Sequence, residues 1–202
     1  SPKRVLMFGL SSASWAAVIA NAPGVEELVV VEINPGYLEV LREREDRKAF
    51  LADKKVKIVI DDGRRWLMRN PDEKFDAVVS NHSYHWRNLA SNLLSVEFNN
   101  LLKEHMNPGA VYIYNTTGEP RVYRTAFESW KHVYRLQNAA VVTDEDAPPA
   151  FDRWKHQLAN WSMWGEPAFD GNEAARQAGA QLVIDDLFVN DTSPTTDESD
   201  LS

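Results

Sequence analysis

Short apolar runs rich in β-branched residues alternate with segments of helical character along most of this chain. The runs lie at residues 4–10, 27–33, 56–60, 75–80 and 110–115. Residues 28–31, Leu-Val-Val-Val, include no polar side chain, which is typical of a strand covered by helices on both faces. Alternating strands and helices predict βα units and a mostly parallel sheet. We therefore expect a doubly wound α/β fold.

Local signals place helices between these strands. Asn34 can cap a helix that begins at Pro35, because the missing N–H of proline costs nothing at the first helical position. The apolar stripe of this helix would come from Leu38, Leu41 and Phe50. Ser95 can cap a second helix over residues 96–105, which the sequence Asn107-Pro108-Gly109 would end.

The pattern changes after Pro120. We expect helices at residues 121–131 and 151–161, and strands at residues 134–143 and 181–189. These two late strands would form an antiparallel edge on the sheet. The domain would span residues 1–190, and the acidic segment 191–202 predicts a disordered tail. Within 151–164, Trp154, Leu158 and Trp161 fall at helical spacing, which favours a packed stripe over an aromatic lid for a cation.

Composition excludes several classes of protein. The chain has 22 Lys and Arg against 30 Asp and Glu, so its net charge of −8 argues against a nucleic-acid binder. It has no cysteine, which excludes thiolate zinc sites and cysteine nucleophiles. No apolar run approaches the roughly 18 residues that span a bilayer, so no membrane contact is expected from this chain. The start at Ser1, without a signal-peptide pattern, indicates an excised domain.

The first candidate for chemistry lies at the ends of the first two strands. Gly9 ends the first strand, and Glu32 ends the second, 23 positions later. Ligands of open α/β sheets bind at these ends, where an acidic residue can accept both ribose hydroxyls. Small residues, including Ser11, stand where nucleotide-binding turns carry further glycines. The alternative is a plain strand-to-helix turn with an exposed Glu32.

A second candidate follows the third strand. Asp62 can accept a hydrogen bond from an adenine amino group, and the N–H groups at the helix start that begins with Gly63 can donate to the ring. The alternative is that Asp62 is only a helix N-cap. Together with Gly9 and Glu32, three successive strand ends carry the groups that a nucleoside needs.

In these residues the chain resembles the spermidine synthase family of aminopropyltransferases, which has the Rossmann-like, class I S-adenosylmethionine-dependent methyltransferase fold. The segments that carry the resemblance are 31–35, 61–64, 75–79, 94–98 and 106–111. The resemblance implies that Glu32 holds the ribose of decarboxylated S-adenosylmethionine and that Asp62 and Gly63 flank its adenine. Gly9, Ser11 and Asn81 complete the residues that we assign to this co-substrate. The resemblance also implies a homodimer.

The catalytic segment of the family normally supplies two aspartates after the fourth strand. Here Asn81 and Tyr84 occupy those positions, and Asn115 stands where the family tends to have glutamine. Asparagine cannot act as a general base, and tyrosine, with a reference pKa near 10, is a poor one. A similar His-Trp-Arg stretch occurs in members of the family that are fused to membrane-spanning segments.

The segment nevertheless offers other groups. His82 or His85 can take the proton that an acceptor amine loses, since histidine titrates near neutral pH. Trp86 and Arg87 are candidates for substrate binding, and Arg87 indicates an acceptor with a carboxylate or phosphate. The alternative is that the aromatic residues pack the loop, Arg87 pairs with a surface acid and the histidines have no role. No third ligand accompanies the histidines, so no metal is expected.

Three functions remain open. The first is transfer of an aminopropyl group to a small-molecule amine from a decarboxylated S-adenosylmethionine-type donor. The second is methyl transfer from S-adenosylmethionine, and the third is nucleoside binding without catalysis in a larger membrane-linked protein. The expected location is the cytoplasm, either free or as the soluble domain of a membrane-anchored protein.

Overall fold

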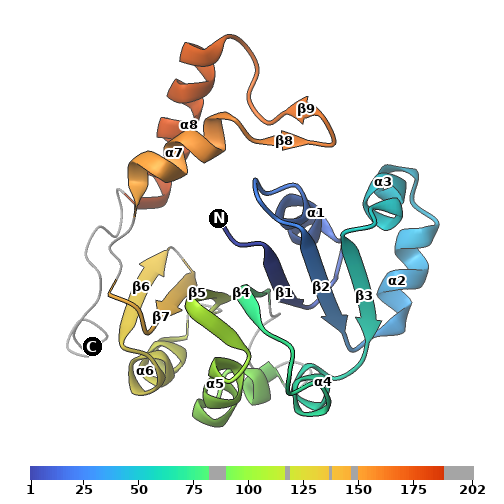
Figure 1. Ribbon diagram of the computed structural model, residues 1–202, viewed down its shortest axis with the longest axis vertical. Helices are drawn as coiled ribbons and strands as arrows, with labels where there is room; N and C mark the ends of the chain where they lie inside the picture. Colours follow the sequence, from blue (N-terminus) through green and yellow to red (C-terminus); the bar gives the residue numbers. More distant parts are fainter. Residues whose placement is uncertain (82–89, 117–118, 137, 147–149, 189–202) are drawn as a thin grey trace.

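The fold is built on one seven-stranded sheet (Figure 1). The structure, a computed structural model, describes residues 1–81, 90–116, 119–136, 138–146 and 150–188. The strand order is β3-β2-β1-β4-β5-β7-β6. The first five strands run parallel, while β7 runs antiparallel to both β5 and β6. The expected doubly wound sheet with an antiparallel edge is therefore confirmed.

The strand boundaries agree with the apolar runs to within a few residues at most ends. The parallel strands are β1 (Arg4–Phe8), β2 (Glu27–Glu32), β3 (Val56–Ile60), β4 (Phe75–Ser80) and β5 (Met106–Asn115). The antiparallel strands are β6 (His132–Leu136) and β7 (Ala139–Thr143).

Helices cover both faces of the sheet. One face carries α1 (Ser14–Ala20), α2 (Pro35–Arg42), the 3-10 turn η1 (Glu45–Arg47) and α3 (Lys48–Ala52). The other carries α4 (Gly63–Arg69), α5 (Val96–Lys103), which follows the 3-10 turn η2 (Ala90–Leu93), and α6 (Pro120–Ser129).

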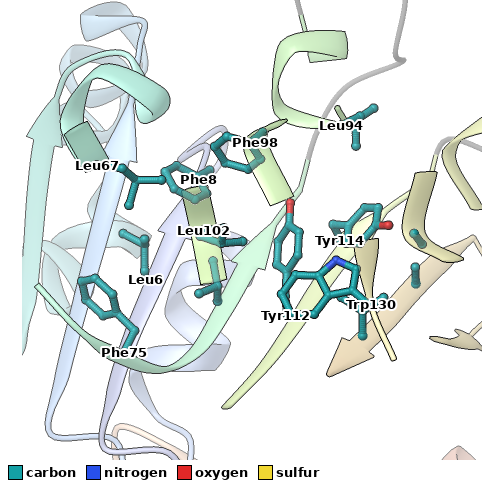
Figure 2. Packing of buried hydrophobic residues seen from close by; sticks show 14 of the residues in the cluster. Leu6, Phe8, Leu67, Phe75, Leu94, Phe98, Leu102, Tyr112, Tyr114 and Trp130 are labelled. Carbon is teal, nitrogen blue, oxygen red and sulfur yellow. The ribbon is translucent and has the colours of Figure 1, made fainter. Parts of the chain in front are cut away.

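Alternate residues of β1 explain why its run is apolar throughout. Val5 and Met7 pack with α1 and α3, whereas Leu6 and Phe8 pack with α4 and α5. Figure 2 shows the second cluster, in which Phe8 meets Phe98 edge to face with ring centroids 5.6 Å apart. Burial on both faces accounts for the absence of polar residues from positions 5–8 of the strand.

The expected helix after Asn34 is interrupted. Asn34 caps α2 as predicted, its side chain accepting from the N–H of Gly36 at 3.0 Å. The helix ends at Arg42, however, and Arg44 is extended, so that Phe50 lies in the separate helix α3. Residues 42–48 are all charged and offer no apolar face to bury, which removes the packing that would extend α2.

Two other expectations, for the segments 134–143 and 107–109, need correction. The segment 134–143 is not one strand: β6 and β7 pair as an antiparallel hairpin. At its turn the carbonyl of Asn138 accepts from the N–H of Thr116, the residue after β5, at 2.7 Å. The segment 107–109 does not end α5 but lies inside β5, with Gly109 at φ +79°. Ser95 caps α5 as predicted.

The expected strand at 181–189 is wrong, because residues up to Phe188 belong to helix α8 (Glu173–Phe188). The first half of α8, residues 173–180, is rich in alanine, a strong helix former, and β6 and β7 already provide the antiparallel edge. The tail 191–202 lies outside the described residues.

Helix α8 packs beside α7 (Phe151–Ala159), apart from the sheet (Figure 1). The short strands β8 (Ser162–Met163) and β9 (Glu166–Pro167) connect the two helices. Trp154, Leu158 and Trp161 are half-buried. The N–H of Trp164 donates to the side chain of Asn21 at 2.9 Å, which joins this unit to the end of α1. None of the helices in the described residues is both long and apolar enough to cross a bilayer.

Candidate functional site

Glu32 lies at the carboxyl end of β2 and is only 4% exposed. Its Oε2 accepts from the N–H of Leu10 at 2.6 Å, and its Oε1 accepts from the N–H of Asn34 at 2.8 Å. The alternative of an exposed glutamate is therefore wrong. Each carboxylate oxygen can accept a second hydrogen bond, so the pair that holds the loop leaves capacity for two further donors.

The loop between β1 and α1 has the left-handed backbone conformations of a glycine-rich turn, although it contains only one glycine, Gly9. Gly9, Ser11 and Ala13 have φ values of +91°, +46° and +59°. Two of these three left-handed positions are therefore occupied by residues with a Cβ, which costs roughly 1–2 kcal/mol each. The N–H of Gly9 donates to the carbonyl of Val31 at 2.9 Å, which fixes the loop against β2.

Asp62 is the N-cap of α4, as one of the two interpretations predicted. Its Oδ1 accepts from the N–H of Arg65 at 2.8 Å, and its side chain is partly exposed. The following Gly63 is buried against Phe8, since a Cβ at Gly63 would lie 2.6 Å from a ring carbon of Phe8. The glycine thus allows α4 to begin directly over β1.

Asp61, next to Asp62, is a charged residue that we did not assign to the site. The hydrogen bond from the Arg65 guanidinium is the main reason why the pKa of Asp61 lies below its ordinary value. The N–H of Asp62 and the charge of Arg69 act in the same direction. Asp61 is therefore ionised and paired at neutral pH.

Asn81 follows β4 and lies beside Gly9, whose added Cβ would be 3.4 Å from the Asn81 carbonyl. The N–H of Asn81 points to the carbonyl of Phe8 at 3.4 Å. The structure thus brings the ends of β1 and β4 together at the position expected for the site. Gly9, Glu32 and Asn81 lie at three adjacent strand ends.

Below Asn81, the hydroxyl of Tyr112 donates to Oγ of Ser80 at 3.0 Å. Tyr112 and Tyr114 are stacked inside the core beside Trp130 (Figure 2). Burial raises the pKa of both phenols well above the ordinary value, so neither can act as a base at neutral pH. No sequence pattern predicted the contact between Tyr112 and Ser80, because the two residues lie on different strands.

The expected catalytic and acceptor-binding residues lie outside the described residues. They are His82, Tyr84, His85, Trp86 and Arg87. Asn115 does lie at the carboxyl end of a strand, β5, as Glu32 does for β2. In the part of the chain that is described, no group of three or more His, Asp or Glu side chains could hold a metal ion.

Ile33 is a residue that we did not assign to the site from the sequence. The strand β2 ends at Glu32, and Ile33, the next residue, is 64% exposed. Single exposed apolar side chains are common on protein surfaces, so it is the position next to the buried carboxylate of Glu32 that makes Ile33 a candidate ligand contact. The signal in the sequence was the isoleucine directly after the acidic strand end.

The strand order, the two helical layers and the antiparallel edge together define the methyltransferase fold. Comparison with known proteins agrees: the sequence model of the methyltransferase domain family matches residues 5–105, half of the chain. The chain therefore belongs to this family, as a divergent, spermidine synthase-like member.

The similarity to spermidine synthases is supported by curated relatives. The polyamine aminopropyltransferase of Mycobacterium tuberculosis is 28% identical over 203 residues, which cover 96% of this chain. This chain spans only 38% of the length of that protein.

Two solved structures share the fold. Spermidine synthase in complex with the transition state analogue AdoDATO superimposes with a TM-score of 0.70 at 16% identity, covering 93% of this chain and 70% of that one. Human methyltransferase-like protein 13 in complex with SAH superimposes with a TM-score of 0.61 at 17% identity, covering 78% and 79%.

Proposed function

We propose that the chain binds an S-adenosyl nucleoside at the carboxyl ends of β1, β2 and β3. We further propose that it transfers an aminopropyl group from decarboxylated S-adenosylmethionine to a small-molecule amine. The two similar solved structures hold AdoDATO and SAH, which are ligands of this class. A homodimer, and a location in the cytoplasm with or without linkage to a membrane protein, are parts of this proposal that rest on the resemblance.

The buried carboxylate of Glu32 is the observation that carries the proposal. A carboxylate is seldom buried unless it is hydrogen-bonded, and here two backbone N–H groups hold it in place. Its free lone pairs would accept the two ribose hydroxyls. A positively charged sulfonium donor also suits a chain with a net charge of −8.

The adenine would lie between the end of β2 and the start of α4. Ile33 would pack against one face of the ring, since it is exposed next to Glu32. Asp62 would accept from the exocyclic amino group, because only its Oδ1 is occupied by the helix cap. Gly63 would allow close approach of the backbone.

In the reaction, the amine lone pair attacks the carbon attached to sulfur, and the electrons of the carbon–sulfur bond pass to sulfur. The products are a neutral thioether nucleoside and a secondary ammonium ion. Before the attack, the ammonium form of the acceptor must lose one proton, because only the free amine has a lone pair. Neither Asn81 nor the buried phenol of Tyr112 can take it. We assign this proton to His82 or His85, with Tyr84 as the third catalytic candidate. Trp86 and Arg87 would contact the acceptor.

Calorimetric titration tests this function directly. Decarboxylated S-adenosylmethionine, S-adenosylmethionine and methylthioadenosine are each added to the purified chain. The proposal expects binding of the decarboxylated donor and methylthioadenosine at least about tenfold tighter than that of the intact donor. Absence of binding by all three would refute a nucleoside site.

Methyl transfer is the second candidate, and the match of the methyltransferase domain family to residues 5–105 favours it. The same titration separates the two, because a methyltransferase would prefer the intact donor with its carboxylate. Nucleoside binding without turnover on any tested amine would instead support a domain that has lost catalysis.

A further inference from the structure

The β1–α1 loop, residues 9–13, is held by side chains from two different elements. Glu32 of β2 accepts from the N–H of Leu10. The other side chain is that of Arg47 in η1, a residue that we did not assign to the site from the sequence. Its Nε donates to the carbonyl of Ser12 at 2.8 Å, although the two residues lie 35 positions apart. Its Nη2 donates to the hydroxyl of Ser14 at 3.4 Å.

The conformation of this loop is unfavourable unless other residues hold it. Ser11 and Ala13 have positive φ values, although each carries a Cβ. Ala13 is also the N-cap residue of α1, and no side chain caps that end of the helix. Left-handed residues other than glycine persist only where the surrounding structure fixes them. The contacts of Arg47 therefore lie where the loop needs support.

A series of hydrogen bonds connects Arg47 to Glu32. Arg47 donates to the carbonyl of Ser12. The N–H of the same peptide unit belongs to Ala13 and donates to the carbonyl of Leu10 at 2.8 Å. The N–H of Leu10 in turn donates to Oε2 of Glu32. Because the peptide unit between Ser12 and Ala13 is held at both ends, it cannot rotate without breaking one of these bonds.

Arg47 is itself held in place. It is the last residue of η1 and the N-cap residue of α3, whose Phe50 is fully buried. Its Nη1 lies 3.2 Å from the carboxylate of Asp46, and its side chain is 19% exposed. An ion pair between exposed neighbours contributes little to stability by itself. Here the pair orients a guanidinium whose Nε is bonded to the loop.

We propose that Arg47 is a positioning residue for nucleoside binding, an inference that rests on the proposed function. Arg47 acts without touching the nucleoside. It stabilises the loop conformation in which the N–H of Leu10 holds the carboxylate of Glu32, whose remaining lone pairs stay free for the ribose. Without Arg47, conformations with negative φ at Ser11 become populated. The apparent affinity then falls with the fraction of chains that keep the binding conformation.

Calorimetric titration with methylthioadenosine tests this role. Arg47→Ala should raise the dissociation constant about tenfold, as expected if about one tenth of the chains keep the binding conformation. Arg47→Lys can keep one hydrogen bond to the carbonyl of Ser12 and should lie between Ala and wild type. Arg44→Ala is the charge-matched control, because the bonds of Arg44 go to Asp46 and not to the loop. Its dissociation constant should stay within about twofold of that of wild type.

Lys55→Ala separates positioning from a general loss of stability. The Nζ of Lys55 donates to the carbonyl of Ala20 at 2.6 Å, at the other end of α1. This contact also joins a basic side chain to a backbone carbonyl, but it lies away from the loop. Both Lys55→Ala and Arg47→Ala should lower the unfolding temperature, whereas only Arg47→Ala should lose affinity for methylthioadenosine.

A second substitution in the Arg47→Ala background tests the mechanism. Ser11→Gly should restore the affinity at least about threefold, because glycine adopts φ +46° without steric cost. Ser12→Gly should not restore it, since Ser12 has no positive φ. Amide hydrogen exchange gives a measurement without ligand. The N–H of Leu10 should exchange about tenfold faster in Arg47→Ala than in wild type, and at the wild-type rate in Arg44→Ala.

The outcomes distinguish this inference from the proposed function. If wild type binds methylthioadenosine and Arg47→Ala binds it within about twofold as tightly, Arg47 has no positioning role. Equal exchange of the Leu10 N–H in both proteins, or no rescue by Ser11→Gly, would also overturn the inference. Failure of wild type to bind any of the three nucleosides would instead refute the proposed function, and the role of Arg47 with it.

Discussion

The backbone N–H of Leu10 and the side chain of Glu32 are joined by a hydrogen bond of 2.6 Å across adjacent strands. Glu32 also holds the N–H of Asn34, so one carboxylate connects the loop after β1 to the cap of α2. Hydrogen bonds to a charged group contribute more than neutral ones, roughly 1.5–3 kcal/mol each. In a loop with a single glycine, this carboxylate defines the shape of the candidate site.

Replacing Glu32 should therefore have two effects. We expect Glu32→Ala to weaken nucleoside binding by about 1.5–3 kcal/mol, or about tenfold to 150-fold, because the acceptor for the ribose is lost. The same variant should lower the free energy of unfolding, since two buried N–H groups lose their partner. Glu32→Gln, which keeps one acceptor, should lie between Ala and wild type. Calorimetry and urea denaturation measure the two effects, and an unchanged dissociation constant in a folded Glu32→Ala would remove this residue from the site.

The left-handed conformation of Ser11 predicts a stabilising substitution. Ser11→Gly should raise the free energy of unfolding by a few tenths to about 1 kcal/mol, because glycine adopts φ +46° without steric cost. Ser12→Gly is the matched control, since Ser12 has no positive φ and the change should be neutral or destabilising. Urea denaturation compares them. A Ser11→Gly variant that is less stable than Ser12→Gly would contradict strain at this position.

The close contact between Gly63 and Phe8 predicts that any side chain at position 63 would clash with the Phe8 ring. Gly63→Ala should cost about 1–3 kcal/mol, because its Cβ would lie 2.6 Å and 2.8 Å from two carbons of the buried ring. The same substitution in a Phe8→Leu background should cost less, since the smaller side chain leaves room. Denaturation of the four proteins gives the coupling energy. Equal costs in both backgrounds would show that the ring is not the obstacle.

At the opposite end of the sheet, Asp76 predicts a dependence of stability on pH. Burial raises the pKa of Asp76, but hydrogen bonds from the N–H of Arg4, the side chain of Asn107 and the N–H of Lys3 outweigh it, so the pKa is lowered. A carboxyl with a lowered folded pKa contributes stability above its unfolded pKa of about 3.9. That contribution is lost as pH falls through the folded value.

Asp76→Asn should therefore be less stable than wild type at pH 7, and the difference should shrink below about pH 4. Urea denaturation across this range measures it. Asp72→Asn is a suitable control, because Asp72 is exposed in the turn before β4. If the difference in the free energy of unfolding between Asp76→Asn and wild type stays constant from pH 7 to pH 3, ionisation of Asp76 does not stabilise the fold.

The candidate bases His82 and His85 can be tested once an acceptor amine supports turnover. Replacing the base by alanine should lower the rate by about 10²–10⁴, while nucleoside affinity stays nearly unchanged. The rate of the free enzyme should rise with pH through a histidine-like pKa of about 6–7. His156→Ala, in α7, is the control. If the double variant of His82 and His85 turns over like wild type, the proton is accepted elsewhere.

The parallel strands, the caps Asn34, Asp62 and Ser95, and the placing of Glu32 at a strand end follow from the sequence by itself. These features depend on local patterns, because burial on both faces makes a strand apolar and a capping side chain bonds only two or three residues ahead. The resemblance to the spermidine synthase family rests on the same local segments.

Only the tertiary structure decided what depends on contacts distant in sequence. Residues 181–188 had the composition of a strand, but the sheet edge was already formed by the hairpin of β6 and β7, so they pack as a helix on α7. Burial of Glu32 depends on the N–H of Leu10, which lies 22 residues away. Gly63 is required because Phe8, from another strand, occupies the space where its Cβ would lie. Sequence patterns report the preference of each segment, whereas competition for the same space and hydrogen bonds is settled only when all segments pack together.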